Sequence, residues 1–334
     1  MSHPMQKATA GGAVLDARLQ VFVSTSSFGK VDARPLRLLE ESGVAVQTNP
    51  FKRTLTSEEA AELLRDVDGL IAGTEPLTRE VLSQAKRLKV ISRCGTGVDN
   101  VDLEAAAELG IVVKATANAH IAAVAELTVG AMISLLRHIP HNDRAVRQGV
   151  WEKRIGQLLQ GRTVGIVGLG KVGKAVVQSL QPFHVRVLAY DPYPDWAFAR
   201  GYAVEYTDLG PLLQASDIVS LHVPYHPDLH HLISRERLAE MRQGAYLLNT
   251  SRGGLVDEEA LCEALHSGRL AGAFIDTFET EPYRGPLLEA PGVILSPHVG
   301  AYARESRLLM ETEAVENLLQ HLKPATLNTE VISR

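Results

Sequence analysis

The 334-residue chain has only two cysteines, Cys94 and Cys262, which provide neither a disulfide framework nor metal-ligand spacing. Its 34 Lys and Arg residues are scattered, and the net charge is −5, which disfavours a general nucleic-acid binder. No apolar stretch is long enough to span a bilayer, and Met1 to Ala17 lacks the apolar core of a signal peptide. We therefore expect a cytoplasmic protein with no metal, nucleic-acid or membrane partner.

Strand and helix patterns alternate in the first part of the chain. The length suggests about two domains, and 45% hydrophobic with 22% charged residues is ordinary for a globular protein. Residues 1 to about 17 are small and polar, and we expect no regular structure there. The alternation predicts a parallel sheet covered by helices on both faces. The expected strands are Leu19–Val23, Val44–Gln47, Gly69–Ala72, Lys89–Ser92 and Ile111–Lys114; the expected helices are Pro35–Ser42, Ser57–Asp66 with Ser57 as N-cap, Arg79–Lys86 and Leu103–Leu109.

A similar alternation runs through the second part. It starts with a helix expected over Ile121–Arg137, whose residues are apolar all round, as in a deeply buried helix. Further helices are expected at Asp257–Ser267, with Asp257 as N-cap, and at Ser306–Leu322. The expected strands are Val185–Tyr190, Asp217–Val223, Ala245–Asn249, Ala273–Asp276 and Val293–Ser296.

The stretch Val164–Val176 carries three glycines in the pattern G-x-G-x-x-G. Gly168 would allow a tight turn out of a strand, Gly170 would let a pyrophosphate approach the backbone, and Gly173 would let the next helix pack closely. The start of that helix offers N–H groups and the positive end of its dipole to phosphates. Such a turn can also serve packing alone, so its surroundings matter.

The strand expected at Val185–Tyr190 ends at Asp191, 18 residues after Gly173. A carboxylate at this position accepts hydrogen bonds from an adenosine ribose. No arginine follows at once, and a carboxylate would repel a 2′-phosphate, so we predict NAD rather than NADP. The fold class is then α/β, with two doubly wound parallel-sheet domains, the second a Rossmann NAD-binding domain.

Three polar residues follow expected strands, where open α/β sheets bind ligands. Arg252 lies in a turn of small residues and could bind a carboxylate through two parallel hydrogen bonds. His298 and Glu281 could form a general acid with an orienting carboxylate, which would favour the protonated imidazole. Taken singly, each could be a solvated or structural side chain.

Together these motifs resemble the D-isomer-specific 2-hydroxyacid dehydrogenase family, and within it the 3-phosphoglycerate dehydrogenase branch in a short form without the regulatory domain. The matching segments follow the family's order and cover nearly the whole chain. They are Arg93–Asp102, Val124–Leu127, Gly165–Gly173, Asp217–Pro224, Asn249–Gly254, Glu281–Pro282 and Ser296–Gly300.

The resemblance implies a role for each matched position. Arg252 would hold the substrate carboxylate and polarise the keto oxygen, His298 would transfer the proton, and Glu281 would pair with His298. Further substrate contacts would come from the backbone of Gly95, Thr96 and Gly97. The implied cofactor contacts, besides the glycines and Asp191, are Lys171 and Val172 over the pyrophosphate and Val223, Pro224, Thr250, Ser251, Asp276 and Gly300 on the nicotinamide side.

The resemblance also implies the domain organisation. Residues 1–117 plus 305–334 would form the substrate-binding domain and 118–304 the NAD-binding domain, with the last helix returning to the first domain. The two domains would close over a cleft, and two subunits would pair as a homodimer through the cofactor domains.

One departure from the phosphoglycerate branch concerns charge. Those enzymes often carry an arginine just after the strand expected at Gly69–Ala72, and here that position is Gly73. Lys52 and Arg53 could supply the missing phosphate contact, or they could belong to a solvated loop.

The predicted activity is hydride transfer between the nicotinamide and C2 of a D-2-hydroxy acid, foremost 3-phosphoglycerate or a similar small anion. Glyoxylate, hydroxypyruvate or another 2-keto acid is the alternative substrate. A different class of function is an NAD-sensing corepressor-like protein that keeps the catalytic residues without turnover.

Overall fold

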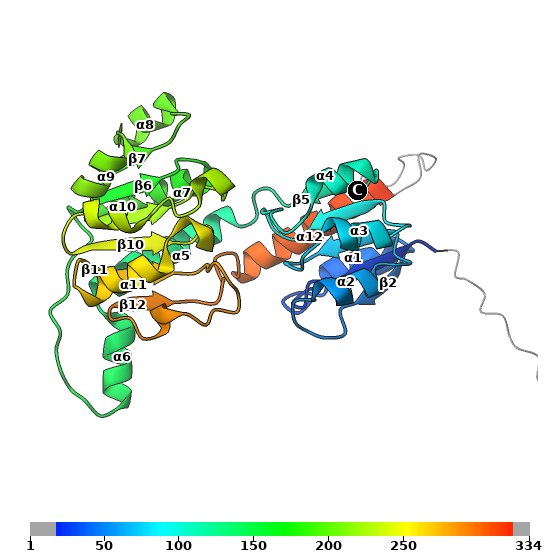
Figure 1. The fold of residues 1–334 in the computed structure, drawn as a ribbon, viewed down its shortest axis with the longest axis horizontal. Coiled ribbons are helices and arrows are strands. Elements are labelled where there is room, and N and C mark those ends of the chain that lie inside the picture. The colour runs from blue at the N-terminus through cyan, green and yellow to red at the C-terminus, as the bar shows by residue number, and fades with distance from the viewer. Residues whose placement is uncertain (1–17, 323–334) are drawn as a thin grey trace, which may run out of the picture. The chain divides into compact units, whose positions relative to one another are not determined.

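The computed structural model describes residues 18–322; the expected unstructured segment 1–17 and residues 323–334 lie outside this range. The described chain forms two compact units (Figure 1). The first takes the chain up to Cys94, then Asn100–Ala115, and the chain from Glu311. The second takes Gly95–Asp99 and Thr116–Met310. The stretch Gly95–Asp99, expected in the first domain, thus packs with the second.

The first unit is built on a five-stranded parallel sheet in the order β2-β1-β3-β4-β5. Its strands are β1 (Gln20–Val23), β2 (Ala45–Thr48), β3 (Gly69–Ala72), β4 (Val90–Arg93) and β5 (Val112–Ala115). Its helices are α1 (Arg34–Glu41), α2 (Ser57–Leu63), α3 (Arg79–Gln84), α4 (Leu103–Glu108) and the C-terminal part of α12 (Arg304–Leu322). Each expected strand and helix of this region is present; β3 has the expected bounds, and the other elements have ends shifted by one to a few residues.

Both faces of the first sheet are covered. On one face, Phe22, Leu70 and Ile91 of three neighbouring strands pack against α2, α3 and α4 in one apolar core. On the other, Leu318 of α12 lies so close to Gly69 that an added Cβ would be 3.1 Å from its Cδ1. The Ser92 hydroxyl also donates to the Ala314 carbonyl of α12 at 2.7 Å. The expected return of the last helix to the first domain is therefore observed.

The start of α2 corrects one prediction. The N-cap is Thr56, not Ser57: the Thr56 hydroxyl accepts from the Glu59 N–H while the Glu59 carboxylate accepts from the Thr56 N–H. This reciprocal capping box satisfies two N–H groups at the helix start. Asp257 caps α11 as expected, by accepting from the Ala260 N–H at 2.9 Å.

The second unit contains a seven-stranded parallel sheet in the order β12-β11-β10-β9-β6-β7-β8. Its strands are β6 (Thr163–Val167), β7 (Arg186–Tyr190), β8 (Val204–Tyr206), β9 (Ile218–Leu221), β10 (Ala245–Asn249), β11 (Leu270–Ile275) and β12 (Val293–Leu295). Its helices are α5 (Ile121–Leu136), α6 (Ile139–Arg147), α7 (Lys171–Leu180), α8 (Trp196–Tyr202), α9 (Leu209–Ala215), α10 (Arg235–Glu240) and α11 (Glu258–His266), and α12 starts here.

Alternate residues of each strand enter two separate cores. In β10, Tyr246 and Leu248 join the core made with α5, α7 and α8. The intervening Ala245 and Leu247 join the core made with α9, α10 and α11. Side chains that alternate along a strand point to opposite faces, so the sheet is buried on both sides, as a doubly wound domain requires.

The order of the strands reverses beside β6. From β6 the chain proceeds outward through β7 and β8, then returns to β9 on the other side of β6 and continues to β12. The carboxyl ends of β6 and β9 therefore mark the switch point where open α/β sheets bind ligands. Here the glycine fingerprint follows β6.

Several elements were not predicted: β8, α8, α9, α10 and α6. The helix α6 has no buried residue, and it projects from the rest of the second unit in Figure 1. The observed strand β9 is shorter than the expected strand Asp217–Val223, since it begins at Ile218 and ends at Leu221. Among residues 18–322 no single helix is long and apolar enough to cross a membrane; α5 and α6 pass that test only as a pair bent by 61°.

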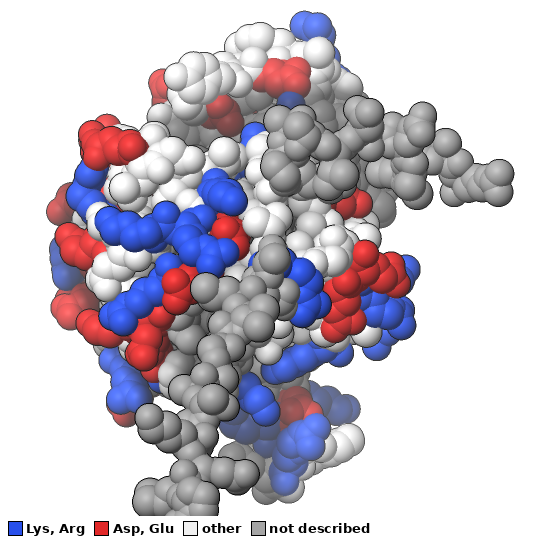
Figure 2. All heavy atoms as spheres, turned by 90° about the vertical axis from the view of Figure 1, so that its right-hand side faces the viewer, with Lys and Arg blue, Asp and Glu red and all other residues white. Residues whose placement is uncertain are grey.

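Charged side chains of both signs are interspersed on the face shown in Figure 2. Among the described residues, oppositely charged side chains form ion pairs such as Arg79 with Glu108 and Arg87 with Asp68. This mixed surface agrees with the scattered charges of the sequence.

Candidate active site

The three predicted catalytic side chains follow three neighbouring strands of the second sheet. β11 pairs in parallel with both β10 and β12, so the carboxyl ends of all three lie at one edge. Arg252 follows β10, Glu281 follows β11, and His298 follows β12. The topology therefore brings together residues that are separated by up to 46 positions in the chain (298 − 252).

His298 and Glu281 form a direct pair. The imidazole Nδ1 lies 3.0 Å from Oε2 and 3.1 Å from Oε1 of the carboxylate, and both side chains are about 40% exposed (40% and 38%). Burial favours the neutral acid, but the His298 hydrogen bond and charge, the Phe278 N–H and the charge of Arg252 outweigh it. The pKa of Glu281 therefore lies below its ordinary value.

The backbone of His298 is held in an unusual conformation. Its φ angle is 53°, in the left-handed region that residues with a Cβ rarely adopt. Its N–H donates to the Asp276 carbonyl at 2.8 Å. The strained turn therefore aims the imidazole, and the end of β11 holds the turn in place.

Asp276 has a structural role that the sequence did not reveal. It is fully buried, and its Oδ1 accepts from the Ser296 hydroxyl at 2.5 Å and from the Val299 N–H at 2.8 Å. Its Oδ2 accepts from the Gly300 N–H at 2.8 Å. The carboxylate thus ties the His298 turn to β11, and a Cβ on Gly300 would lie only 3.1 Å from Oδ2.

Arg252 is fixed by an acidic partner that was not predicted. Its Nε and Nη2 donate to the two carboxylate oxygens of Asp99 at 3.2 and 3.3 Å, and its Nη1 donates to the Ser251 carbonyl at 2.8 Å. A Cβ on Gly97 would lie 1.8 Å from Nη2, so a larger residue there would displace the guanidinium from this position. The G-x-G-x-D spacing of Gly95, Gly97 and Asp99 was the available signal.

The other predicted substrate contacts lie in the same stretch. The Gly95 carbonyl accepts from the Thr116 N–H at 3.1 Å. The Thr96 hydroxyl donates to the Thr116 carbonyl at 3.1 Å and lies 2.7 Å from Nδ1 of His120. These bonds hold Gly95–Asp99 to the start of the second part of the chain.

The glycine fingerprint has the geometry expected of a phosphate-binding turn. Gly168 has φ 95°, and a Cβ there would meet the backbone of His222 at 2.8 Å. A Cβ on Gly173 would lie 2.2 Å from the Gly168 carbonyl oxygen, whereas a Cβ on Gly170 would meet nothing within 4 Å. Gly168 and Gly173 are therefore required for the turn and the helix approach, and Gly170 faces open space.

The helix behind this turn is suited to an anion. Gly170 is the N-cap of α7 and has no capping side chain, so the first N–H groups of the helix lack that partner. Lys171 stands at the helix start and donates to Asn118 at 2.8 Å, while Val172 is partly buried. A pyrophosphate fits this combination of open backbone, helix dipole and a basic side chain.

The carboxylate of Asp191 is positioned to accept hydrogen bonds from a ribose. Its Oδ2 accepts from the Leu169 N–H at 2.8 Å and its Oδ1 from the Tyr193 N–H at 2.9 Å. Each carboxylate oxygen can accept a second hydrogen bond, so both can also accept from ribose hydroxyls. The bond to Leu169 holds the carboxylate beside the glycine turn.

The remaining predicted cofactor residues also surround the switch point. Val223 contacts the Gly168 position, and the following Pro224 is exposed. The Thr250 hydroxyl lies 3.3 Å from that of Thr128, and the Ser251 hydroxyl donates to the Leu221 carbonyl at 2.8 Å. The side-chain oxygens of Thr250 and Ser251 thus have structural partners, and their contacts to a cofactor remain predictions.

A buried carboxyl group stands near the position of the missing arginine. Glu75 is 2% exposed, and it hydrogen-bonds the Ser24 hydroxyl and, at 3.2 Å, the Gly73 N–H. Burial raises the pKa of Glu75, against the opposing Ser24 hydrogen bond and the charge of Arg93. Arg53 donates to both carboxylate oxygens of Glu59, at 2.8 and 2.6 Å. Of the two basic residues predicted as phosphate contacts, Arg53 thus has an acidic partner.

Comparison with known proteins agrees with this geometry. The family model "D-isomer specific 2-hydroxyacid dehydrogenase, NAD binding domain" matches residues 129–300, just over half of the chain. D-3-phosphoglycerate dehydrogenase of Methanocaldococcus jannaschii is 40% identical over 295 residues, covering 86% of this chain and 55% of the relative. Glyoxylate reductase of Thermofilum pendens is 41% identical over 289 residues, covering 82% of this chain and 85% of the relative.

A solved structure shows the same likeness. The crystal structure of D-lactate dehydrogenase from Aquifex aeolicus, complexed with NAD and lactic acid, has a TM-score of 0.78 and 27% identity, covering 88% of this chain and 93% of the other. The chain thus spans nearly the whole of this dehydrogenase but about half the length of the archaeal phosphoglycerate dehydrogenase.

Proposed function

Because the chain belongs to the D-isomer specific 2-hydroxyacid dehydrogenase family, we propose that it interconverts a small D-2-hydroxy acid and its 2-keto acid with NAD. When bound, NAD supplies the hydride donor or acceptor at its nicotinamide. The observation that carries the proposal is the His298–Glu281 pair, which lies one strand away from the Arg252 turn at the carboxyl edge of the sheet.

His298 is the proposed general acid and base. Because Glu281 occupies Nδ1, the other ring nitrogen, Nε2, is the one that can give a proton to the keto oxygen or take it from the hydroxyl. The ionised Glu281 stabilises the imidazolium that forms during oxidation and keeps the ring oriented. A positioned acid or base of this kind contributes about 10²–10⁴ in rate.

Arg252 is the proposed carboxylate clamp. A guanidinium has five N–H donors, and the described bonds to Asp99 and Ser251 use three of them. The remaining donors can bind the substrate carboxylate and polarise the keto oxygen. Asp99 and Gly97 hold the group in place, which reduces the ordering cost of binding.

For the substrate, we favour a small unphosphorylated 2-keto acid such as glyoxylate or hydroxypyruvate. Phosphoglycerate enzymes of this family often have an arginine after the strand that corresponds to β3. Here Gly73 stands at that position, beside the buried carboxyl group of Glu75, and Arg53 is paired with Glu59. A phosphate dianion would therefore find no arginine at this position, and the group beside it is a carboxyl rather than a cation.

3-Phosphoglycerate is the second candidate. The segment Arg93–Asp102 resembles the phosphoglycerate branch, and the 40% identity to the archaeal enzyme supports it. Lys52 is exposed, so its side chain could still supply one positive charge to a phosphate. Its backbone has φ 56°. The two candidates differ in whether the substrate carries a phosphate.

A substrate panel tests both the class and the substrate. Purified protein is mixed with NADH and, in turn, glyoxylate, hydroxypyruvate, pyruvate and 3-phosphohydroxypyruvate, and the nicotinamide absorbance is followed. We expect the highest kcat/KM with an unphosphorylated acid; a preference for the phosphorylated acid would select the second candidate. NADH binding without turnover on any acid would instead favour a corepressor-like binding protein.

We further propose that the protein forms a homodimer in the cytoplasm through its NAD-binding domain. In that unit, α6 and the segment after it expose large apolar side chains: Ile139, Val146, Val150, Trp151, Ile155 and Leu158. Trp151 is 82% and Ile155 95% exposed, and apolar groups so placed favour burial against a second copy. Light scattering of the wild type and of Ile155→Asp tests this; a monomeric wild type would refute it.

A further inference from the structure

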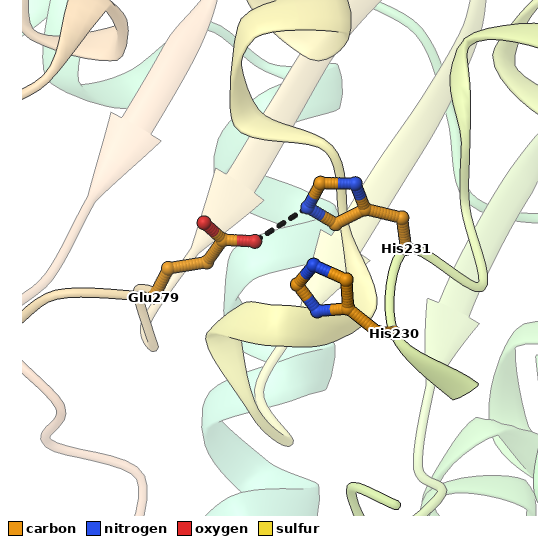
Figure 3. Close-up of side chains that lie close together, drawn as sticks. All are labelled: His230, His231 and Glu279. Atoms are coloured by element: carbon orange, nitrogen blue, oxygen red, sulfur yellow. Dashed lines mark hydrogen bonds and ion pairs between the residues drawn. The ribbon is translucent and has the colours of Figure 1, made fainter. Parts of the chain in front are cut away.

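Three side chains of metal-ligand type converge in the second unit, apart from the proposed catalytic residues. His230 and His231 follow the short 3₁₀ turn Pro227–Leu229, and Glu279 lies in the segment after β11. One ligand atom from each falls within 4.8 Å of the other two. Figure 3 shows the Glu279 carboxylate facing the edges of the two imidazole rings.

The two imidazoles are stacked on each other. Their ring centroids are 3.9 Å apart with an interplanar angle of 23°. Nε2 of His231 lies 2.5 Å from Oε1 of Glu279 (Figure 3). His230 and Glu279 are exposed and His231 is partly buried, so the group is open to ions from solution.

The backbone around both histidines is fixed by hydrogen bonds. The His230 N–H donates to the Pro227 carbonyl at 3.0 Å, and the His231 N–H donates to the Gly254 carbonyl at 2.8 Å. Tyr225 Oη lies 3.4 Å from Nδ1 of His230, which leaves Nε2 as the ligand atom of that ring. Outer partners of this kind set the orientation of metal-binding imidazoles.

The carboxylate side is held in a similar way. The Glu279 N–H donates to Oε1 of Glu258 at 2.9 Å, and Glu258 also interacts electrostatically with Glu279, His231 and Glu281. Three carboxyl groups near two imidazoles make the local potential favourable for a cation. Glu281 itself is occupied by His298, so Glu279 is the carboxylate that can serve as a ligand.

We propose that His230, His231 and Glu279 form a binding site for a divalent transition metal ion, of which Zn²⁺ is the best match. Two imidazole nitrogens and one carboxylate oxygen are a donor set that zinc accepts, with the fourth position left to water. Magnesium and calcium prefer sets of oxygen ligands, whereas imidazole suits zinc, copper and nickel.

Metal binding would link two segments that are distant in the chain. The ion would replace the hydrogen bond between His231 and Glu279 with bonds to both, and would add His230. Glu279 lies two residues before Glu281, which holds His298. The ion would therefore tie the segment that carries the catalytic carboxylate to the turn after β9.

Calorimetric titration of the chelator-treated full chain with ZnCl₂ tests the site. We expect one equivalent to bind with micromolar affinity, and MgCl₂ to give no comparable heat. His230→Ala and Glu279→Gln should each weaken zinc binding at least roughly tenfold. Circular dichroism and the melting temperature without metal show whether each variant is folded; His230→Ala removes an exposed ring and should fold.

Two control variants separate this site from others. His141→Ala changes a partly exposed histidine of α6, and Cys262→Ser removes a thiol that lies 3.5 Å from Nδ1 of His266 on α11. Both should bind zinc like the wild type. Wild-type affinity in His230→Ala, loss of binding in Cys262→Ser, or no binding to the wild type would overturn the proposal.

Cobalt provides a readout that depends on geometry. Co²⁺ bound by two imidazoles, a carboxylate and water should give visible absorption bands with the intensity of a four-coordinate ion. His230→Ala should lower that intensity at saturating Co²⁺ because one nitrogen ligand is lost. A spectrum identical to that of the wild type would show that the ion binds elsewhere.

Discussion

The two units of this protein share an architecture but differ in the turn that follows the first strand of each unit. In the first unit, β1 leads into Ser24, whose hydroxyl bonds the buried Glu75 carboxyl group and receives the Gly73 N–H at 2.8 Å. In the second, β6 leads into Gly168 and Gly170, and the N-cap of the next helix has no side-chain partner. In the first unit, polar side chains of the protein occupy the carboxyl edge of the sheet. In the second unit, backbone N–H groups at that edge are available to a ligand.

This contrast shows that a doubly wound sheet does not bind a nucleotide by virtue of its topology. Both sheets are parallel and covered on both faces, yet only the glycine turn combines a tight bend, a close helix and open space. The function follows from a few residues at the carboxyl edge. Changes at those residues can therefore test each unit separately.

The largest expected effect is on proton transfer in the second unit. His298→Ala should lower kcat by about 10²–10⁴ because the general acid and base is lost. NADH affinity, measured by nicotinamide fluorescence, should stay close to that of the wild type, because His298 is not part of the glycine turn. Wild-type turnover in this variant would refute the catalytic assignment.

Arg252→Lys should have the next largest effect. An ammonium cannot form the planar fork that binds a carboxylate through two hydrogen bonds, nor keep both bonds to Asp99. We expect kcat/KM to fall about 10²-fold, equivalent to ~3 kcal/mol, with KM raised. Steady-state kinetics on the best acid of the panel measure this. A KM equal to that of the wild type would argue against a role in substrate binding.

The second and third glycines of the fingerprint, Gly170 and Gly173, should respond differently to the same change. Gly173→Ala places a Cβ 2.2 Å from the Gly168 carbonyl oxygen, so α7 must move, and both stability and NADH affinity should fall. Gly170→Ala meets nothing within 4 Å in the protein. It should therefore keep its melting temperature and lose only NADH affinity. Equal loss of stability in both variants would contradict the assigned roles.

The two units should also respond to pH in opposite directions. The imidazole of His222, after β9, has a buried Nδ1 without a partner in the described chain, and burial lowers its pKa to about 4. The unfolded chain takes up this proton near the ordinary value of 6.5, so His222 should cost stability as pH falls from 6.5 toward 4. Complete titration corresponds to about 3 kcal/mol, an upper limit.

Titration of Glu75 in the first unit changes the stability in the opposite direction. Burial raises its pKa above the ordinary value of 4.5, so the unfolded chain loses the proton first and stability falls as pH rises past that value. Urea unfolding across pH 4–8 should show a flatter acid side for His222→Asn and a flatter neutral side for Glu75→Gln. Parallel curves for the wild type and either variant would contradict that residue's contribution.

The local sequence pattern was sufficient to predict the bounds of an element that is short, apolar and flanked by a clear boundary. β3 and β10 have the expected bounds, because Gly73 follows one and the polar pair Thr250-Ser251 follows the other. The helix α6 was missed because none of its residues is buried, so no apolar period marks it. α8 and α10 each bury one residue, Ala199 and Leu238, which is too little to produce a helical pattern.

The sequence by itself determined the alternation of strands and helices, the glycine turn with Asp191, and the three candidate catalytic residues. These features depend on local spacing, which the chain carries at each position. Only the tertiary structure decided that Asp99 holds Arg252, that Asp276 ties down the His298 turn, and that His230 and His231 meet Glu279. Such pairs join residues 23 to 153 positions apart, and tertiary packing, rather than local pattern, brings them together.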